Sequence, residues 1–263
     1  MCHGIGDRHS HVSHERSNND RDVRETDSGL RASQHTGSPT WMTRRQCIIM
    51  GAIVAASIFA GTRPPAAWAT TKYPKTIEAL LYAYDREMAL YYEYVAFGKV
   101  AKAEGYIGIA YLFTALGSAE LIHAQNFGKI LSRHGVELPS GGTPTVSTAK
   151  TQENLIKAAD AEVDAVETFY PEILQKLGAE DMKDAIMATN HAWESEKQHK
   201  GIIKKIQRWS PSFFERVART IDEHTGPYFV CQVCGSTMTE IPPDTCPICK
   251  LSSQHYRKIE IPD

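Results

Sequence analysis

The sequence contains the same arrangement of two glutamates and one histidine twice. In each copy a glutamate is followed, after 32 or 33 residues, by a Glu-x-x-His motif. The six residues are Glu87, Glu120 and His123 in the first copy and Glu162, Glu196 and His199 in the second. Residues three positions apart share one helix face, so each motif can direct both side chains at one metal ion. A single motif also fits a solvated, charged helix face. The matched repeat instead favours the ligand set of a di-iron site in a four-helix bundle.

Four cysteines near the C-terminus form two Cys-x-x-Cys pairs separated by 11 residues: Cys231, Cys234, Cys246 and Cys249. Two such pairs can hold one iron ion or a structural zinc ion in a tetrahedral thiolate site, and the spacing does not distinguish the two metals. A pair of disulfides is the alternative. The two other cysteines, Cys2 and Cys47, lie in the N-terminal region, so none remains for a further disulfide in the rest of the chain.

The elements that must position these residues are four long helices, separated by glycine and proline. Apolar residues recur at helical spacing over residues 74–103, 106–134, 148–177 and 180–209. Gly105, Gly135 and Gly178 are predicted to end the first three helices. Pro171 falls inside the third helix and should kink it, because proline cannot donate the backbone hydrogen bond.

The lengths of the connections predict the topology. The first two helices meet at a tight turn and must be antiparallel neighbours, and so must the last two. Residues 135–147 lie between the pairs and can span about 45 Å, which matches a helix of about 42 Å. The sequence therefore predicts an all-α ferritin-like four-helix bundle with one long crossover, over residues 70–209.

A linker and a small second domain are expected after the bundle. Residues 210–227 are predicted to form a linker with a short amphipathic helix. Residues 228–263 are too few for a large core, so the metal must nucleate this β module.

The N-terminal 69 residues are not expected to belong to the fold. Residues 1–41 are polar and nearly free of aliphatic side chains, which predicts disorder. Residues 42–69 are typical of a Tat-type export signal, with Arg44-Arg45, a 14-residue apolar run and the cleavage pattern Ala67-Trp68-Ala69. Met42 is therefore a candidate start. The sequence predicts a periplasmic or otherwise exported protein with no membrane contact after signal removal; an uncleaved membrane anchor is the alternative.

The composition limits the other partners. The chain has 263 residues and 42% hydrophobic content, enough for one or two domains with a core. Its net charge of -2 gives no reason to expect a nucleic acid or an anionic membrane as a partner. No G-x-G-x-x-G motif is present, so no nicotinamide site is visible and an external electron donor or reductase is required.

With these motifs in this order, residues 75–260 resemble the rubrerythrin family, in which a rubredoxin-like domain follows a ferritin-like di-iron domain. Besides the two Glu-x-x-His segments, the resemblance rests on Ala103-Glu104-Gly105-Tyr106, Phe169-Tyr170-Pro171, Cys231-Gln232-Val233-Cys234-Gly235 and Cys246-Pro247-Ile248-Cys249. It implies that the two glutamate–histidine sets bind two iron ions and that the cysteines bind one. It also implies that Tyr94 and Tyr170 lie near the di-iron site; packing in the core is the alternative for both.

The resemblance further implies reduction of hydrogen peroxide, with electrons passing from the rubredoxin-type iron to the di-iron site, often across a head-to-tail homodimer. Two positions depart from the family pattern. Ala165 stands where the family usually has a glutamate that can replace a histidine ligand, which questions the iron movement associated with that residue. Lys250 stands where the second cysteine pair is commonly followed by glycine, which weakens the assignment of iron over zinc there.

Three functions compete. The first is a di-iron peroxidase fed by the four-cysteine iron. The second is a ferroxidase that handles iron with oxygen or peroxide, which Ala165 favours and the fused cysteine module opposes. The third is an electron carrier without catalysis, which would leave the glutamate–histidine sets without a purpose.

Overall fold

The computed structural model describes residues 72–139, 144–207 and 227–260, and positions 214, 216 and 218 between the last two ranges. The predicted disordered extension (1–41), the signal segment (42–69) and most of the predicted linker (210–227) lie outside the described residues and stay predictions. All the described residues belong to one compact unit of the chain.

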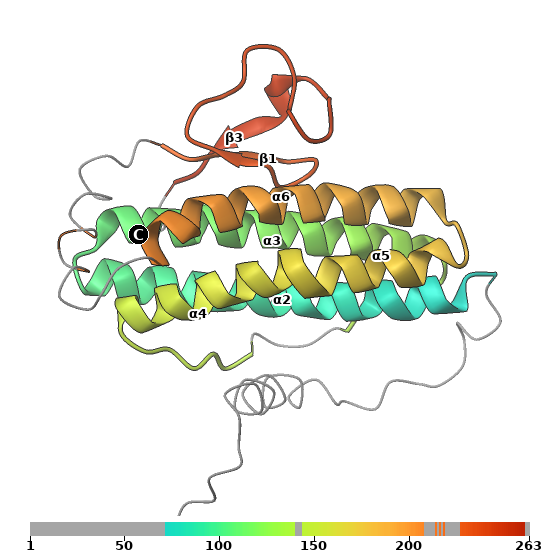
Figure 1. The fold of residues 1–263 in the computed structure, drawn as a ribbon, viewed down its shortest axis with the longest axis horizontal. Helices are drawn as coiled ribbons and strands as arrows, with labels where there is room; N and C mark the ends of the chain where they lie inside the picture. Colours follow the sequence, from blue (N-terminus) through green and yellow to red (C-terminus); the bar gives the residue numbers. More distant parts are fainter. Residues whose placement is uncertain are drawn as a thin grey trace, which may run out of the picture. The chain divides into compact units, whose positions relative to one another are not determined.

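Within the described residues, four helical rods lie side by side in a bundle (Figure 1). They are α2 (Pro74–Ala103), α3 (Ile107–Arg133), a composite rod of α4 (Thr151–Asp164), the π-helical turn η3 (Ala165–Phe169) and α5 (Tyr170–Gly178), and finally α6 (Lys183–Gln207). The predicted ferritin-like four-helix fold is confirmed, and the helix bounds agree with the predicted ones to within about one turn.

Glycine ends α2 and α3, as predicted. Gly105 and Gly135 have φ of 87° and 74°, a left-handed conformation that costs a residue without Cβ little. The tight turn at Gly105 makes α3 an antiparallel neighbour of α2. Among the described residues, α3 is the one helix long and apolar enough to cross a membrane. However, 72% of its apolar stretch is buried, as in the core helix of a bundle.

The long crossover connects α3 to α4. Figure 1 shows the described parts of this connection running along the outside of the bundle, so α4 starts at the end where α3 also starts. A hydrogen bond holds this arrangement: the backbone N–H of Thr151 donates to Glu104 Oε2 (3.0 Å), which ties the start of α4 to the turn between α2 and α3.

The predicted kink in the third helix takes the form of a π-helical turn. η3 occupies the turn immediately before Pro171, which lies in the first turn of α5. Proline has no N–H and its ring crowds the carbonyl one turn earlier, so widening that turn lets the rod continue. The π-helical turn starts three residues after Glu162.

Two apolar clusters fill the bundle and leave a polar layer between them. On α2, one cluster contains Ile77, Leu80 and Ala83, and the other contains Tyr94 and Phe97. Glu87 lies between the two sets on the same helix. Apolar packing above and below therefore holds this layer at a fixed height in the bundle.

The C-terminal module is a small antiparallel sheet in the order β2-β1-β3. Its strands are β1 (Phe229–Cys231), β2 (Thr237–Met238) and β3 (Tyr256–Lys258), with the short helix η4 (Ser253–His255) before β3. Phe229 pairs with Met238 on one side and with Lys258 on the other. The predicted β module is confirmed, and β1 and β2 contact the bundle at α3 and α6.

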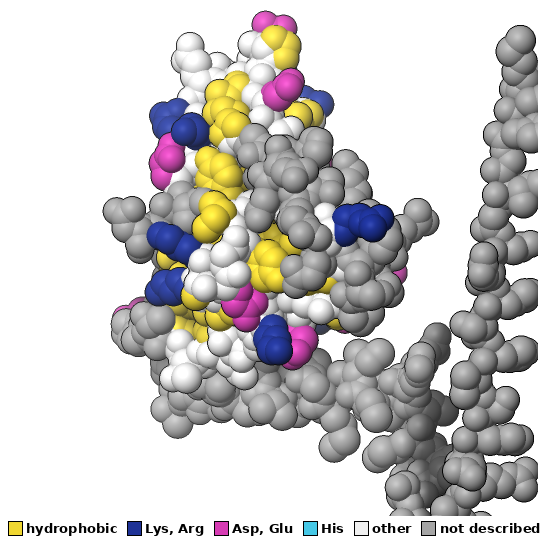
Figure 2. Space-filling view, turned by 90° about the vertical axis from the view of Figure 1, so that its left-hand side faces the viewer, with side chains coloured by type: hydrophobic (Ala, Val, Ile, Leu, Met, Phe, Trp, Pro, Cys, Tyr) yellow, Lys and Arg dark blue, Asp and Glu magenta, His cyan; other side chains and the backbone are white. Residues whose placement is uncertain are grey.

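Charged and apolar side chains both lie on the face shown in Figure 2. Lysine, arginine and acidic side chains are interspersed there around apolar ones.

Candidate metal centres

The structure brings the six predicted glutamates and histidines together in the polar layer of the bundle. Glu87 comes from α2, Glu120 and His123 from α3, Glu162 from α4, and Glu196 and His199 from α6. All six are at most 1% exposed. We call this group the cage. Glu120 and Glu196 belong to both of its candidate metal sites, in which the ligand atoms lie within 4.8 Å of one another. The two sites differ in their remaining pair, Glu87 with His123 or Glu162 with His199.

The cage has the chemistry of a cation site. Buried atoms without a hydrogen-bond partner point to it: Glu87 Oε2, Glu120 Oε1, Glu162 Oε2, both Glu196 carboxylate oxygens and His199 Nδ1. An unpaired buried polar atom is costly, and several around one space are explained when a cation satisfies them together. Carboxylates and imidazoles suit iron. The donor set therefore fits the two iron ions that the sequence predicts.

Protons and cations compete in the cage. Burial raises the pKa of Glu87 and of Glu162, each to about 7. Glu120 and Glu196 are equally buried, but the two histidines overcome burial and lower the pKa of each to about 2. In turn, burial disfavours the charged imidazoles, yet the glutamates raise the pKa of His123 and of His199 well above the usual range. A metal ion must therefore displace protons from this site.

Two tyrosines orient the glutamates that belong to only one site. Tyr94 donates to Glu162 Oε1 (2.6 Å), and Tyr170 donates to Glu87 Oε1 (2.9 Å). Each bond leaves the other carboxylate oxygen facing the cage. Burial and nearby carboxylates raise the pKa of both hydroxyls well above 10, so they stay protonated. Both tyrosines are also fully buried in the core, so the two roles considered for them coexist.

The structure places a positively charged side chain, that of Arg86, beside the cage, and the sequence analysis did not identify this residue. The Arg86 side chain is 15% exposed, and its Nη1 lies 3.4 Å from Glu87 Oε1. Its Nη2 donates to the Ala161 carbonyl (3.0 Å), and its guanidinium lies 4.4 Å from the centre of the Phe169 ring. Nothing in the local sequence indicates that this arginine points inward. The packing of α2 against α4 and η3 turns it toward the cage.

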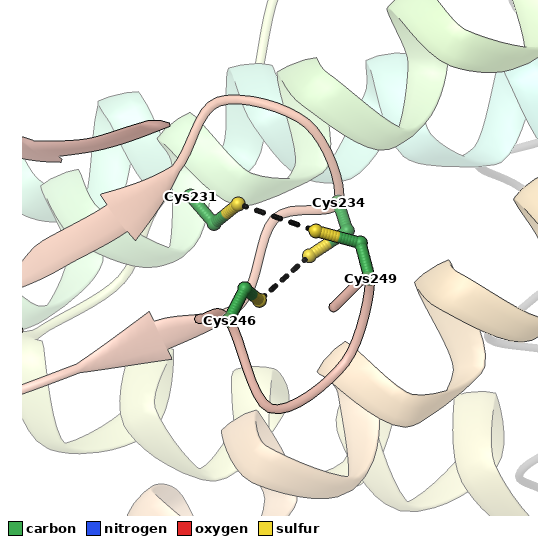
Figure 3. A group of neighbouring side chains, drawn as sticks. All are labelled: Cys231, Cys234, Cys246 and Cys249. Atoms are coloured by element: carbon green, nitrogen blue, oxygen red, sulfur yellow. Dashed lines mark hydrogen bonds between the residues drawn. The ribbon is translucent and has the colours of Figure 1, made fainter. Parts of the chain in front are cut away.

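The second candidate centre is formed by the four cysteines, whose sulfurs point toward one another (Figure 3). The Sγ atoms are 3.9 Å apart for Cys231 and Cys249 and 3.5 Å apart for Cys234 and Cys246, and all four thiols are free. The disulfide alternative is therefore wrong. Hydrogen bonds from the Cys231 and Cys234 thiols lower the pKa of Cys246, whereas the pKa of Cys231 and of Cys234 is raised, so a metal ion must displace protons from these two thiols.

The two cysteine pairs form matching turns. Gly235 N–H donates to Cys231 O (2.9 Å), and Lys250 N–H donates to Cys246 O (3.1 Å). Both closing residues have positive φ, 80° for Gly235 and 61° for Lys250. The lysine therefore adopts the conformation that glycine takes in the first turn, at a cost of about 1 kcal/mol. The departure at Lys250 leaves the geometry of the site intact.

The cysteine module docks directly on the cage histidines. His123 Nε2–H donates to Cys234 O (3.2 Å), and His199 Nε2–H donates to Thr237 Oγ1 (3.1 Å). Because each Nε2 donates outward, each Nδ1 faces the cage. The fit is close: a Cβ on Gly235 would overlap His123 Nε2, at a separation of 2.3 Å.

Two further side chains hold the module in place. Asn126 donates to Val233 O (2.7 Å), and Gln198 Oε1 accepts from Ser236 Oγ (3.0 Å) and Thr237 N (3.2 Å). Neither contact was predicted from the sequence. The one available signal was that Asn126 and Gln198 lie on the helices of the Glu-x-x-His motifs, within one turn of His123 and His199.

Comparisons with known proteins agree with this architecture. Residues 78–207 match the family model "Rubrerythrin", and residues 229–257 match "Rubrerythrin, rubredoxin-like domain". The two matched ranges together cover more than half of the chain. The first contains all six cage residues and the second all four cysteines.

Similar proteins and solved structures belong to the same group. Rubrerythrin-2 from Clostridium acetobutylicum is 24% identical over 72% of this chain and 98% of its own length. Nigerythrin from Nitratidesulfovibrio vulgaris is 28% identical over 68% of this chain and 84% of its own length. The solved structure of fully reduced, all-ferrous nigerythrin has a TM-score of 0.56 and 26% identity, covering 70% of this chain and 86% of that one. With both domains matched in order and both metal centres assembled, the chain belongs to the rubrerythrin family.

Proposed function

We propose that the protein reduces hydrogen peroxide to water, with two iron ions in the cage and one at the four cysteines. Each peroxide consumes two electrons and two protons and yields two water molecules. Iron in the cage would supply the two electrons, and iron at the cysteines would replace them one at a time. Family membership supports iron at both centres, and the unpaired cage atoms support two cations in the bundle.

One contact carries the proposal: the hydrogen bond from His123 Nε2 to Cys234 O. Cys234 would bind the cysteine-site iron through its sulfur, and His123 would bind a cage iron through Nδ1. A few covalent bonds and this one hydrogen bond therefore join the two centres. Such a connection is useful to an enzyme that receives electrons from outside the cage.

The residues around the cage also suit peroxide chemistry. The cage is buried, so its hydrogen bonds and charges act in a medium of low polarity. Tyr94 and Tyr170 each place a hydroxyl proton against one of the two glutamates at the ends of the cage. Because each hydroxyl has one proton and donates it to a glutamate, the two tyrosines would support the reaction by holding these carboxylates in position.

A ferroxidase is the second candidate, favoured by Ala165. This residue is fully buried at the start of η3, one turn after Glu162, and offers no carboxylate to move between ligand positions. A cage of only six ligands suits oxidation of iron that is itself the substrate. Under the peroxidase proposal, Ala165→Glu should raise the rate with peroxide relative to the rate with oxygen.

Pre-steady-state kinetics with a matched variant separates the two functions. Reduced protein is mixed anaerobically with hydrogen peroxide or with oxygenated buffer, and Cys246→Ser is compared with the unmodified chain. A peroxidase reacts faster with peroxide, and its turnover with an external reductase is lost in Cys246→Ser. Full turnover in that variant, or oxidation of far more than two added ferrous ions per chain, would favour the ferroxidase.

Three further proposals concern the electron donor, the oligomeric state and the location of the protein. We propose an external reductase as the electron donor, a homodimer in solution, and export through the Tat route with cleavage after Ala69. Sedimentation and mass spectrometry of the exported protein test the last two. Mixing Cys246→Ser with Glu120→Ala tests whether electrons cross between copies. Because the contact between His123 and Cys234 lies within one chain, we expect the mixture of the two variants to recover no peroxide turnover.

A further inference from the structure

We propose that Arg86 is a fixed positive charge that raises the reduction potential of the cage and so favours its return to the reduced state. The inference rests on the proposed function, because it requires iron in the cage. Arg86 precedes Glu87 on α2 and acts through that glutamate, so it is a positioning and electrostatic residue.

The surroundings of Arg86 fix its position. Nη1 lies 3.4 Å from Glu87 Oε1, the oxygen that also accepts from Tyr170. Nη2 donates to Ala161 O (3.0 Å) and lies 3.5 Å from Asp164 Oδ2. The Phe169 ring covers the guanidinium at 4.4 Å. Contacts on both α2 and α4 therefore keep the charge beside one end of the cage.

The positive charge of Arg86 is not lost near neutral pH. Burial disfavours the charged form, but Glu87 and the other acidic neighbours raise the pKa of Arg86 above its already high ordinary value. A guanidinium at this position therefore acts as a permanent cation.

The two ends of the cage differ in this respect. Glu162 Oε1 accepts a hydrogen bond from the neutral Tyr94. Among the residues that the structure describes, no lysine or arginine forms an ion pair with Glu120, Glu162 or Glu196. Lys200 follows His199 in sequence, as Arg86 precedes Glu87, but it pairs with the exposed Glu167 (2.6 Å) instead. Within the described part of the chain, only the Glu87 end has a lysine or arginine against its carboxylate.

The sign of the effect follows from the charges. The four cage glutamates carry four negative charges when ionised, which balance two ferrous ions. Every electron lost adds a positive charge, and a nearby fixed cation disfavours that change. The oxidised cage is therefore destabilised relative to the reduced one, which raises the potential.

The alanine at position 165 also raises the reduction potential of the cage. A carboxylate there would offset part of the added charge, and Ala165 cannot. Arg86 contacts Ala161 and Asp164, the turn that leads into this position. The chain thus lacks a carboxylate at position 165 and has a positive charge in the same region, and the one carboxylate that Arg86 contacts there besides Glu87, that of Asp164, is 57% exposed to solvent.

A redox titration of three variants tests the inference. Arg86→Gln removes the charge and keeps a donor, Arg86→Lys keeps the charge and loses the planar fork, and Lys200→Met is the matched control. In Arg86→Gln the cage potential should fall by the equivalent of a tenfold change in the redox equilibrium or more, about 59 mV for one electron. The cage potential should fall less in Arg86→Lys and should not change in Lys200→Met. The potential of the four-cysteine site, measured in the same samples, should stay constant.

Binding of Co²⁺ to the metal-free variants gives a second measurement that needs no redox chemistry. Removing a nearby cation should tighten Co²⁺ binding to the cage several-fold in Arg86→Gln. Weaker binding would show that Arg86 only orients Glu87, and an unchanged potential in an iron-loaded Arg86→Gln protein would likewise overturn the inference. Absence of iron from the cage of the unmodified protein would instead overturn the proposed function.

Discussion

The cage and the four-cysteine site are built in opposite ways. The cage residues are spread in sequence from Glu87 to His199 and lie on four helices, whereas the cysteines all lie within residues 231–249. Apolar packing above and below positions the cage, while two short turns position the sulfurs. The cage is therefore a product of the whole bundle, and the cysteine site is a local structure that we expect to depend on its metal.

The comparison predicts that losing one cysteine unfolds the module but not the bundle. Cys246→Ser should lose the metal at the cysteines and most hydrogen-exchange protection in β2 and β3, because these short strands cannot form a sufficient core; β1 should keep more, since Val230 packs in the apolar cluster of the bundle. Helices α2 to α6 should keep their protection and the cage should keep its iron. Metal analysis and exchange mass spectrometry check both halves. A module that stayed protected without metal would contradict the comparison.

Removing a ligand of the cage should leave the cysteine module intact. Glu120 belongs to both cage sites, so Glu120→Ala should lose both iron ions there and peroxide turnover with them. The visible spectrum of the cysteine iron should survive. Glu194→Ala is the control, because the Glu194 side chain is 51% exposed and pairs with Lys197 on the surface. Retention of two cage irons in Glu120→Ala would refute the assignment of this ligand.

Gly235→Ala tests the contact between the two centres. Its Cβ would overlap His123 Nε2, so the module should move away and electron transfer between the centres should slow several-fold. The left-handed conformation adds about 1 kcal/mol of strain. Rapid-mixing absorbance measures the transfer, and metal analysis confirms that both sites stay loaded. Gly201→Ala has open space around it and should transfer electrons at the normal rate.

The pH dependence of iron binding should reveal the protons that the cage holds before metal enters. Glu87 and Glu162 have pKa values raised to about 7, so below that pH they take up protons that compete with metal. The apparent affinity of the cage should therefore rise as the pH increases through this value and fall as the pH drops below it. Titration of metal-free protein with Fe²⁺ under argon measures this. An affinity independent of pH across this range would show that neither these glutamates nor the two histidines hold protons that metal must displace.

The smallest expected effect is a difference in metal affinity between substitutions at the two ends of the cage. Glu162 Oε1 accepts from Tyr94, whereas Glu87 Oε1 accepts from both Tyr170 and Arg86. Tyr94→Phe should weaken metal binding by about 1 kcal/mol, the usual value of one hydrogen bond, and Tyr170→Phe by less. Competition with a coloured chelator gives both values. Equal losses would mean that Arg86 does not support Glu87.

The same contrast explains what the sequence could predict. Ligand types at helical spacing located the cage, glycines located the ends of α2 and α3, and local spacing located the cysteines. Arg86, Asn126 and Gln198 could not be found in this way. Each acts through a partner distant in sequence, and only the packed bundle brings the two together. The π-helical form of the turn before Pro171 was equally hidden, because proline predicts a disturbance but not how the backbone absorbs it.

The two nitrogens of His123 also link metal loading to domain docking. At a pH where the metal-free His123 is a neutral imidazole, a cation on Nδ1 draws electron density from the ring and makes Nε2–H a stronger donor, which tightens its bond to Cys234 O. His199 and Thr237 form a second bond of the same kind. By reciprocity, docking of the module must increase the affinity of the cage for metal by the same factor. Metal binding in the cage and docking of the cysteine module are therefore coupled equilibria, and a chain that lost the metal of its cage would also hold the module less firmly.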